Sequence, residues 1–588
     1  MTASDTLSFA NVAAAFEELE HTSSRKQLTA ILANLVRHVD AGEIAQVAYL
    51  LQGRVAPLYE PIEFGLGERS MEKAVSDVYG VDPTEIRRRD ALAGDLGLVV
   101  AELASSSPPG VVPSVRDVFS KLRSLADISG VGSGERKLAV VRELLTGLDP
   151  ISAKHLVRIP LGKSRLGVGD ATILAAFNEA RLGGTKAEQV VLEDAYNRTS
   201  DLGLVGQTLW QHGVDAVSKL QVTVGRPIRP QLAERLPDIP SLLDKLGGRA
   251  HTQLKFDGIR VQLHLDRREA EGHQVRLFSR SLEDMTGMFP ELVDGVLKQV
   301  KAETAILDSE ALAFNPASEE FLPFQETTRR RRKTGIDAAA TELPLKAMVF
   351  DVMYRDGQPL LDRPLLERME VLTSVVHGKE VLQPETGVVV EDPERLDEIF
   401  EDALERGLEG LVVKRVDSPY QAGARNFNWV KLKRHSRGAL DDTIDCVLLG
   451  YFGGRGKRVG LGVGALLVGV YDKEADVFKT VTKIGTGLSD EQWREVGTRA
   501  EPYRSAQRPA RVQSTITPSV WLEPAIVVEV LADEITSSPN HSAGYALRFP
   551  RVIRFRDADK RPEDATTLQE LIELYQAQPG RALGQPGG

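Results

Sequence analysis

The segment Gln253-Leu254-Lys255-Phe256-Asp257-Gly258-Ile259-Arg260 decides how the centre of this chain folds. In a β-strand, residues two apart share a face, so Gln253, Lys255 and Asp257 are expected on one face. The leucine and the phenylalanine between them then point into the core, and the glycine that follows permits a tight turn before the arginine. The segment therefore predicts a lysine that is held on rigid backbone beside a carboxylate.

Lys255 in this setting is a candidate nucleophile. A lysine attacks only as a neutral amine, a form that is scarce at neutral pH unless the surroundings disfavour the charge. The stretch Trp429–Lys433 places two lysines on one strand face, and such cations favour the neutral amine by like-charge repulsion. The alternative is a surface pair between Lys255 and Asp257, although a chance Lys-x-Asp-Gly-x-Arg match is expected only about once in a few hundred chains of this length.

The chain of 588 residues is long enough for roughly three or four domains. Helical periodicity runs from Ser8 to about Leu220, and two prolines in Arg226–Pro230 suit an extended connector. Strand-like alternation with intervening helices follows, and after Arg434–Gly438 short strands with glycine-rich turns indicate a small barrel. We therefore expect a multidomain chain with an all-α domain at 1–220, an α+β domain at 221–437, a β-barrel domain at 438–575 and a flexible tail at 576–588.

Composition narrows the functional classes. The sequence has no basic segment followed by an apolar run at its start and no stretch of about 20 uninterrupted apolar residues, which argues against secretion and membrane insertion. Cys446 is the only cysteine, so an internal disulfide and a four-cysteine zinc site are excluded. We expect a cytoplasmic protein, in the cytosol or nucleoid of a prokaryote.

The formal net charge of −11 argues against a protein that grips nucleic acid through bulk positive charge, so any DNA contact must be local. A single basic run is equally well explained by a solvated face. Three basic clusters in segments that contain glycine or proline instead favour phosphate binding. They are residues 329–333; Arg455, Lys457 and Arg458; and Arg548, Arg551, Arg554 and Arg556.

Further motifs follow Lys255 along the chain: Ser279-Arg280 with Glu283-Asp284, Leu307–Glu310, Met348–Asp351, Glu409–Lys414, Trp429–Lys433 and Leu547–Arg551. Their order resembles that of the ATP-dependent DNA ligases of the covalent nucleotidyltransferase superfamily, and a shared order is far more specific than one match. The resemblance extends over nearly the whole chain. Within the family, the chain resembles the three-domain type found among archaeal and eukaryotic replicative ligases.

The resemblance implies a set of nucleotide-binding residues. Lys255 would be the catalytic nucleophile, and Phe350 would stack on the adenine, with a core phenylalanine as the alternative. Glu310 and Glu409 would position magnesium, which prefers oxygen ligands, or else be solvated surface glutamates. Three arginines with planar guanidinium groups would bind the ribose and the phosphates: Arg260, Arg280 and Arg425.

The resemblance also implies residues that handle the leaving group and the DNA. Four cations would balance charge on the departing pyrophosphate: Lys431, Lys433, Arg548 and Arg551. The last two are also candidate DNA contacts. Phe324 and Phe549 resemble aromatic residues that press against the sugars at a nick, and each could instead be a core residue.

Gln253 departs from the family pattern, which has a glutamate two residues before the nucleophile to read the adenine amino group. An amide oxygen can accept the same hydrogen bond, although without charge assistance. We therefore expect adenine recognition to survive at this position.

The implied architecture is an all-α DNA-binding domain, an α+β nucleotidyltransferase (adenylation) domain and a β-barrel OB-fold domain. The implied reaction uses ATP and Mg²⁺ to form lysyl-AMP, transfers the AMP to the 5′-phosphate of nicked double-stranded DNA, and seals the nick with the 3′-hydroxyl. Such an enzyme serves DNA replication, repair and recombination. We expect a monomer, and a sliding-clamp partner cannot be read from the sequence.

Four alternatives remain open. An RNA-capping guanylyltransferase shares the catalytic and barrel domains, but the long helical region counts against it, as it does against an RNA ligase. An NAD-dependent ligase resembles a different domain plan with a cysteine-rich zinc module that one cysteine cannot build. A non-catalytic nick-binding scaffold is opposed by the intact charged motifs.

Overall fold

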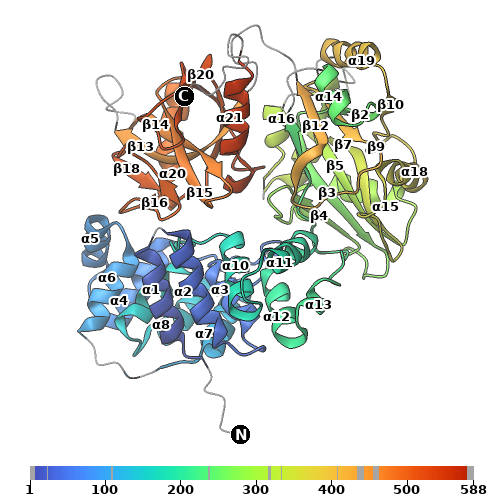
Figure 1. Ribbon diagram of the computed structural model, residues 1–588. Helices are drawn as coiled ribbons and strands as arrows, with labels where there is room; N and C mark the ends of the chain where they lie inside the picture. The colour runs from blue at the N-terminus through green and yellow to red at the C-terminus, as the bar shows by residue number, and fades with distance from the viewer. Residues whose placement is uncertain are drawn as a thin grey trace.

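The computed structural model describes residues 7–22, 24–106, 110, 112–235, 239–315, 320–322, 324–332, 334–406, 408–433, 443–453 and 462–578. Figure 1 shows three bodies in chain order, which we call the helical domain (blue to teal), the middle domain (green through yellow) and the C-terminal domain (orange to red). The helical domain lies below the other two in this view. No helix in the described ranges has both the length and the apolar character to cross a membrane.

The helical domain packs amphipathic helices around one apolar core. The side chains of Phe9, Val12, Phe16 and Leu19 recur at helical spacing and form a face that is fully or almost fully buried. The helices are α1 (Phe9–Glu20), α2 (Arg25–Arg37), α3 (Ile44–Leu51), α4 (Glu68–Tyr79), α5 (Pro83–Ala93), α6 (Leu96–Ser105), α7 (Val115–Asp127), α8 (Ser133–Leu145), α9 (Pro150–Arg158), α10 (Asp170–Arg181), α11 (Lys186–Thr199), α12 (Leu202–His212) and α13 (Val214–Val217).

The middle domain contains two sheets with helices against them. One sheet has the order β1-β12-β11-β2-β10, with β1 (Leu232–Arg235), β12 (Arg425–Lys433), β11 (Gly410–Arg415), β2 (Ala250–Lys255) and β10 (Val388–Val390). The other has the order β4-β3-β5-β7-β8, with β4 (Val275–Ser279), β3 (Ile259–Asp266), β5 (Thr304–Asn315), β7 (Leu345–Arg355) and β8 (Gln358–Pro359). Two short strands pair with it, β6 (Glu320–Phe321) and β9 (Leu382–Pro384). The helices are α14 (Ile239–Lys245), α15 (Pro290–Gln299), α16 (Phe324–Thr328), α17 (Ile336–Glu342), α18 (Leu365–Val375) and α19 (Pro393–Glu405).

The segment from Gln253 to Arg260 joins these two sheets. β2 ends at Lys255 and β3 begins at Ile259, so Asp257 lies in the turn between sheets rather than in a strand as predicted. A side chain at Gly258 would collide with the carbonyl oxygen of Ala311, so the turn requires glycine. Lys255 therefore stands at the edge where the two sheets meet.

The C-terminal domain is built on a curled sheet. Its order is β16-β18-β13-β14-β15-β17, and β19 pairs with both β13 and β22. The strands are β13 (Ile444–Gly453), β14 (Val463–Asp472), β15 (Val477–Ile484), β16 (Arg504–Ser505), β17 (Val512–Gln513), β18 (Val520–Leu522), β19 (Val527–Leu531), β20 (Glu534–Ser537), β21 (Tyr545–Arg548) and β22 (Arg551–Phe555), with α20 (Asp490–Ala500) and α21 (Leu568–Gln576). Most of the predicted tail at 576–588 lies outside the described residues.

Asp170 joins all three domains. It stands at the first position of α10 and accepts hydrogen bonds from Tyr196 of the same domain at 2.6 Å, Arg229 before β1 at 3.1 Å and Arg561 of the C-terminal domain at 2.8 Å. The two arginines hold the pKa of Asp170 below its ordinary value in spite of its burial. The carboxylate therefore fixes the helical domain against the other two.

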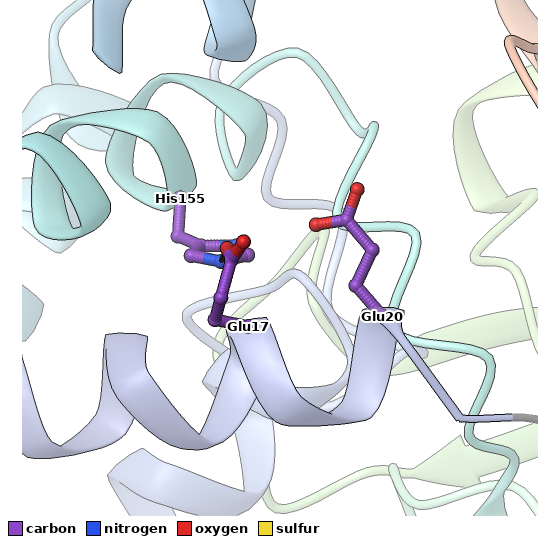
Figure 2. Close-up of side chains that lie close together, drawn as sticks. All are labelled: Glu17, Glu20 and His155. Carbon is purple, nitrogen blue, oxygen red and sulfur yellow. Dashed lines mark hydrogen bonds and ion pairs between the residues drawn. The ribbon is translucent and has the colours of Figure 1, made fainter.

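Glu17 and Glu20 on α1 and His155 on α9 form the tightest group of metal-ligating side chains among the described residues. Figure 2 shows Glu17 against the ring of His155, with Glu20 farther along the same helix. Buried cations already neutralise both carboxylates, because Lys154 lies 2.7 Å from Glu17 and 2.9 Å from Glu20, and Arg158 lies 2.8 Å from Glu20. The cluster is therefore an ion-pair network that ties α1 to α9.

This network makes the stability of the helical domain depend on acid pH. Burial raises the pKa of Glu20, but Arg158 and Lys154 outweigh it and lower the pKa from 4.5 to about 2. Because the folded pKa lies below the unfolded one, the stabilisation is fully present above about pH 4.5 and is lost as the pH falls through 2. We predict that Glu20→Gln lowers the free energy of unfolding by about 3 kcal/mol at pH 7 and by less at pH 3, measured by urea unfolding. Exposed Glu18→Gln is the control, and an equal loss at both pH values would contradict the prediction.

Candidate active site

A cavity of about 180 Å³ lies between the middle and C-terminal domains. The structure places there, from both sheets of the middle domain, most of the nucleotide-binding residues expected from the sequence: Gln253, Lys255, Arg260, Arg280, Glu310, Phe350, Glu409, Arg425 and Lys431. The C-terminal domain contributes the opposite wall, including Asp445, Glu529, Arg556, Asp559, Lys560, Asp564 and Glu570. The side chain of Lys433 lies outside the described residues.

Lys255 forms an ion pair with Glu409 inside this cavity. The pairing follows from the register of the first sheet, in which Lys255 lies opposite Gly410, the residue after Glu409. Both side chains are about one-fifth exposed. The sequence predicted cations around Lys255, whereas the structure gives it a carboxylate as its contacting partner, with Lys431 farther along the cavity wall on β12.

Gln253 lies at the end of the cavity beside Phe350 and is 2% exposed. Its Nε2 donates hydrogen bonds to the backbone carbonyls of Phe350, at 3.1 Å, and of Glu385. Its Oε1 is buried and has no hydrogen-bond partner among the described residues. Because the two carbonyls fix the orientation of the amide, the oxygen is left to accept a hydrogen bond from a ligand.

Two aromatic rings and a buried lysine complete this end of the cavity. Phe350 and Trp429 meet edge to face, with ring centroids 6.2 Å apart. Lys414, to which the sequence assigned no role, is 1% exposed and lies 3.9 Å from the Trp429 centroid. Burial, together with Arg368 and Arg260, lowers the pKa of Lys414 to about 7. Its Nζ and the Trp429 Nε1 have no hydrogen-bond partner in the described structure.

The three predicted arginines have different surroundings. Arg260 is held by two hydrogen bonds to the buried Asp308, at 3.1 and 2.6 Å. Arg280 and Arg425 instead face carboxylates of the C-terminal domain: Arg280 lies 4.0 Å from Asp564, and Arg425 forms an ion pair with Glu570. Anionic groups of the C-terminal domain therefore occupy the cationic end of the cavity.

Three family models match this chain in succession. The model described as "DNA ligase N terminus" matches residues 8–178, "ATP dependent DNA ligase domain" matches 230–433, and "ATP dependent DNA ligase C terminal region" matches 460–560. A probable DNA ligase of Dictyoglomus turgidum is 43% identical over 97% of this chain and 98% of its own length. DNA ligase 2 of Thermofilum pendens is 39% identical over 100% of both chains, and a DNA ligase of Sulfolobus acidocaldarius is 37% identical over 97% and 98%.

The chain belongs to the ATP-dependent DNA ligases. The family predicted from the order of the motifs is thereby confirmed, as are the enzyme class and the three-domain plan with a helical N-terminal region. The general function of this family is the sealing of nicks in DNA with ATP as cofactor.

The ligase has carboxylates in its cavity that suit a magnesium ion. Glu310 and Glu409 both line the cavity, and magnesium needs only one or two carboxylates because it keeps several waters. Glu310 accepts a hydrogen bond from the backbone of Gly258 at 3.2 Å. Burial raises the pKa of Glu310 to about 7, and Lys255 and Arg260 oppose the rise. A buried carboxylate of this kind is stabilised by a bound cation, so these residues fit the metal.

The cations that the C-terminal domain brings to the site differ from those predicted. Arg548 and Arg551 lie outside the cavity, about half exposed and paired with Glu534 at 3.8 Å and Asp533 at 3.5 Å. Three later basic residues take that place: Arg554, which binds Asp257 with two hydrogen bonds of 3.0 Å, and the cavity-lining Arg556 and Lys560. Strict strand alternation would place Arg551 and Arg554 on opposite faces of β22, but a register shift opposite Glu529 and Val530 interrupts the alternation, so the sequence carried no signal that separates them.

Of the two aromatic residues predicted to touch DNA, only Phe549 has a side chain that the structure describes. Phe549 is 67% exposed and has a backbone φ of 49°, a left-handed conformation that is strained for a bulky residue. Arg548 lies over its ring at 5.5 Å. The side chain of Phe324, on α16, lies outside the described residues.

Proposed function

We propose that this ligase loads AMP from ATP onto Lys255 and uses it to seal 5′-phosphate/3′-hydroxyl nicks in duplex DNA. The observation that carries the proposal is a set of buried polar atoms without partners in the described structure, on residues that line the same cavity as Lys255: Gln253 Oε1, Lys414 Nζ and Trp429 Nε1. A buried polar group without a partner costs about 1–3 kcal/mol, so these atoms require a ligand or water.

Adenine is complementary to this set. Its amino group is a donor for the oxygen of Gln253, and its ring nitrogens are acceptors for Lys414 and Trp429. Guanine carries a carbonyl where adenine carries the amino group, and that carbonyl would face the Gln253 oxygen. Phe350 lies where a base can stack beside these groups. The site therefore favours ATP over GTP. For the same reason it disfavours the capping reaction, which uses GTP.

In the first step the nitrogen of Lys255 bonds to the α-phosphorus of ATP while the bond to pyrophosphate breaks and the amine loses a proton. An ammonium that is bound to a carboxylate has no free lone pair, so Glu409 must first release Lys255. Glu409 and Glu310 would hold magnesium, which neutralises charge on the phosphates. Lys431 and Lys433 would bind the phosphates, joined by Arg280 and Arg425 after the carboxylates of the C-terminal domain have left these two arginines.

The AMP then passes to the 5′-phosphate of the nick, and the 3′-hydroxyl attacks to seal the strand and release AMP. The cavity is covered by the C-terminal domain, which must therefore move before DNA reaches Lys255. We assign residues 1–220 to DNA binding, 221–437 to nucleotide transfer, 438–575 to an OB-fold and 576–588 to a tail. We further propose a monomer acting in the cytosol or nucleoid in DNA replication, repair and recombination.

Loss of the nucleophile provides the direct test. Lys255→Ala and Lys255→Arg should take up no label from ATP that is labelled at the α-phosphate, because alanine has no amine and arginine is not nucleophilic at neutral pH. Label is measured on the denatured chain after incubation with magnesium, and its release is followed on adding a nicked duplex. The exposed Lys298→Ala should label and seal normally. Label on Lys255→Ala would refute the assignment, and label from GTP alone would indicate a capping enzyme.

Gln253→Glu tests how the base is read. The carboxylate would place an oxygen against the two carbonyls that the amide now bonds, so we expect ATP use to fall about tenfold. ATP should still be preferred over GTP, because the remaining oxygen still accepts from the adenine amino group. The measurement is kcat/KM for self-adenylation with each nucleotide. A switch of preference to GTP would show that the assignment of the Gln253 oxygen to the adenine amino group is wrong.

Phe549→Ala tests the DNA contact. We expect it to weaken the binding of a nicked duplex about tenfold, in the range measured for aromatic contacts to nucleotides, and to leave self-adenylation unchanged because the ring lies outside the cavity. Binding is measured by fluorescence anisotropy with a labelled duplex. Val131→Ala, which changes another highly exposed apolar residue, is the comparison, and unaltered affinity in Phe549→Ala would remove Phe549 from the DNA interface.

A further inference from the structure

Gln231 is a cavity residue to which no nucleotide-binding motif assigns a role. It follows Pro230 at the end of the connector and directly precedes β1. Its side chain is 0% exposed, and it lines the cavity beside Lys255. A polar amide in such a place requires hydrogen-bond partners.

All but one of the polar groups of Gln231 have partners. Its backbone N–H donates to the Tyr420 hydroxyl at 3.1 Å, and its carbonyl accepts from Arg260 at 2.7 Å. Its side-chain oxygen accepts from the backbone N–H of Gln421 at 2.9 Å. That contact fixes the amide so that Nε2 is on the other side, and Nε2 is buried without a partner in the described structure. The donor is therefore held ready for an acceptor inside the cavity.

The position of Gln231 along the cavity indicates which part of a nucleotide it meets. Arg260, which bonds its carbonyl, lies 5.4 Å from the ring of Phe350 at the aromatic end. Leu232, the next residue, pairs with Arg425 at the cationic end. Gln231 therefore adjoins both Arg260 and the start of the β1–β12 pair. A nucleotide bound with its base beside Phe350 and its α-phosphate at Lys255 has its sugar near Arg260, the residue that Gln231 contacts.

We propose that Gln231 Nε2 donates a hydrogen bond to a hydroxyl oxygen of the ribose, and that Gln231 is a specificity-determining residue for ribonucleotides. The inference rests on the proposed adenylation of Lys255. A sugar without that hydroxyl leaves the buried donor unpaired, so the deoxynucleotide binds less well.

The test compares ATP, 2′-deoxy-ATP and 3′-deoxy-ATP as donors for self-adenylation. We expect the wild type to use ATP about tenfold better than the analogue that lacks the contacted hydroxyl. Gln231→Met keeps the side-chain volume and removes the donor, so kcat/KM for ATP should fall about tenfold while that analogue changes less than twofold. Gln231→Glu keeps an oxygen for Gln421 and should lose the selectivity in the same way.

Gln262→Met is the matched control. Gln262 is 1% exposed, binds Ile228 of the same connector at both ends of its amide, and does not line the cavity. It should keep the ratio between ATP and both analogues even if its overall rate falls. An unchanged ratio in Gln231→Met, or a wild type that uses all three nucleotides equally, would overturn the inference. A wild type that takes no label from any of them would instead refute the proposed function.

Discussion

The ion pair between Lys255 and Glu409 is the constraint on which the rest of the site depends. It exists because β2 and β11 pair antiparallel, so that the end of one strand meets the start of the other. The turn at Gly258 then carries the chain into the second sheet, where Glu310 lies opposite Arg260. The carboxylates, the lysine and the arginine are thereby held by two sheets, and rigid strands position such groups better than loops do.

Charge balance explains why the C-terminal domain lies over the cavity. The cavity gathers arginines and lysines from the middle domain, and buried charges are costly without partners. Glu570 and Asp564 supply those partners for Arg425 and Arg280, while Arg554 neutralises Asp257. A bound triphosphate offers the same arginines an alternative anion, so nucleotide and carboxylates compete for them. The covered arrangement is thus held by charge pairs between the two domains.

Much of the fold and part of the site could be predicted from the sequence, because short-range pattern determines them. Helical spacing gave the N-terminal region, and motif order gave the family and the middle-domain residues that meet in the cavity. The partners could not be predicted, since they depend on contacts between distant segments. The partner of Lys255 is 154 residues away, and the choice of Arg554 over Arg551 depends on how a whole domain docks. Gln231 was missed because a single polar residue carries no pattern, and Lys414 was given no role although it ends the Glu409–Lys414 motif.

On the proposed assignments, the cavity would recognise the base and the sugar of its nucleotide with fixed amides rather than with complementary charge. In Gln253 the nitrogen is bound by backbone carbonyls and the oxygen is left over, while in Gln231 the oxygen is bound and the nitrogen is left over. A buried polar atom without a partner costs free energy, and the apolar cores of the two sheets offset that cost. A nucleotide that satisfies both atoms recovers it, so binding selects for hydrogen-bond pattern even though the whole region carries charges that would accept any polyphosphate.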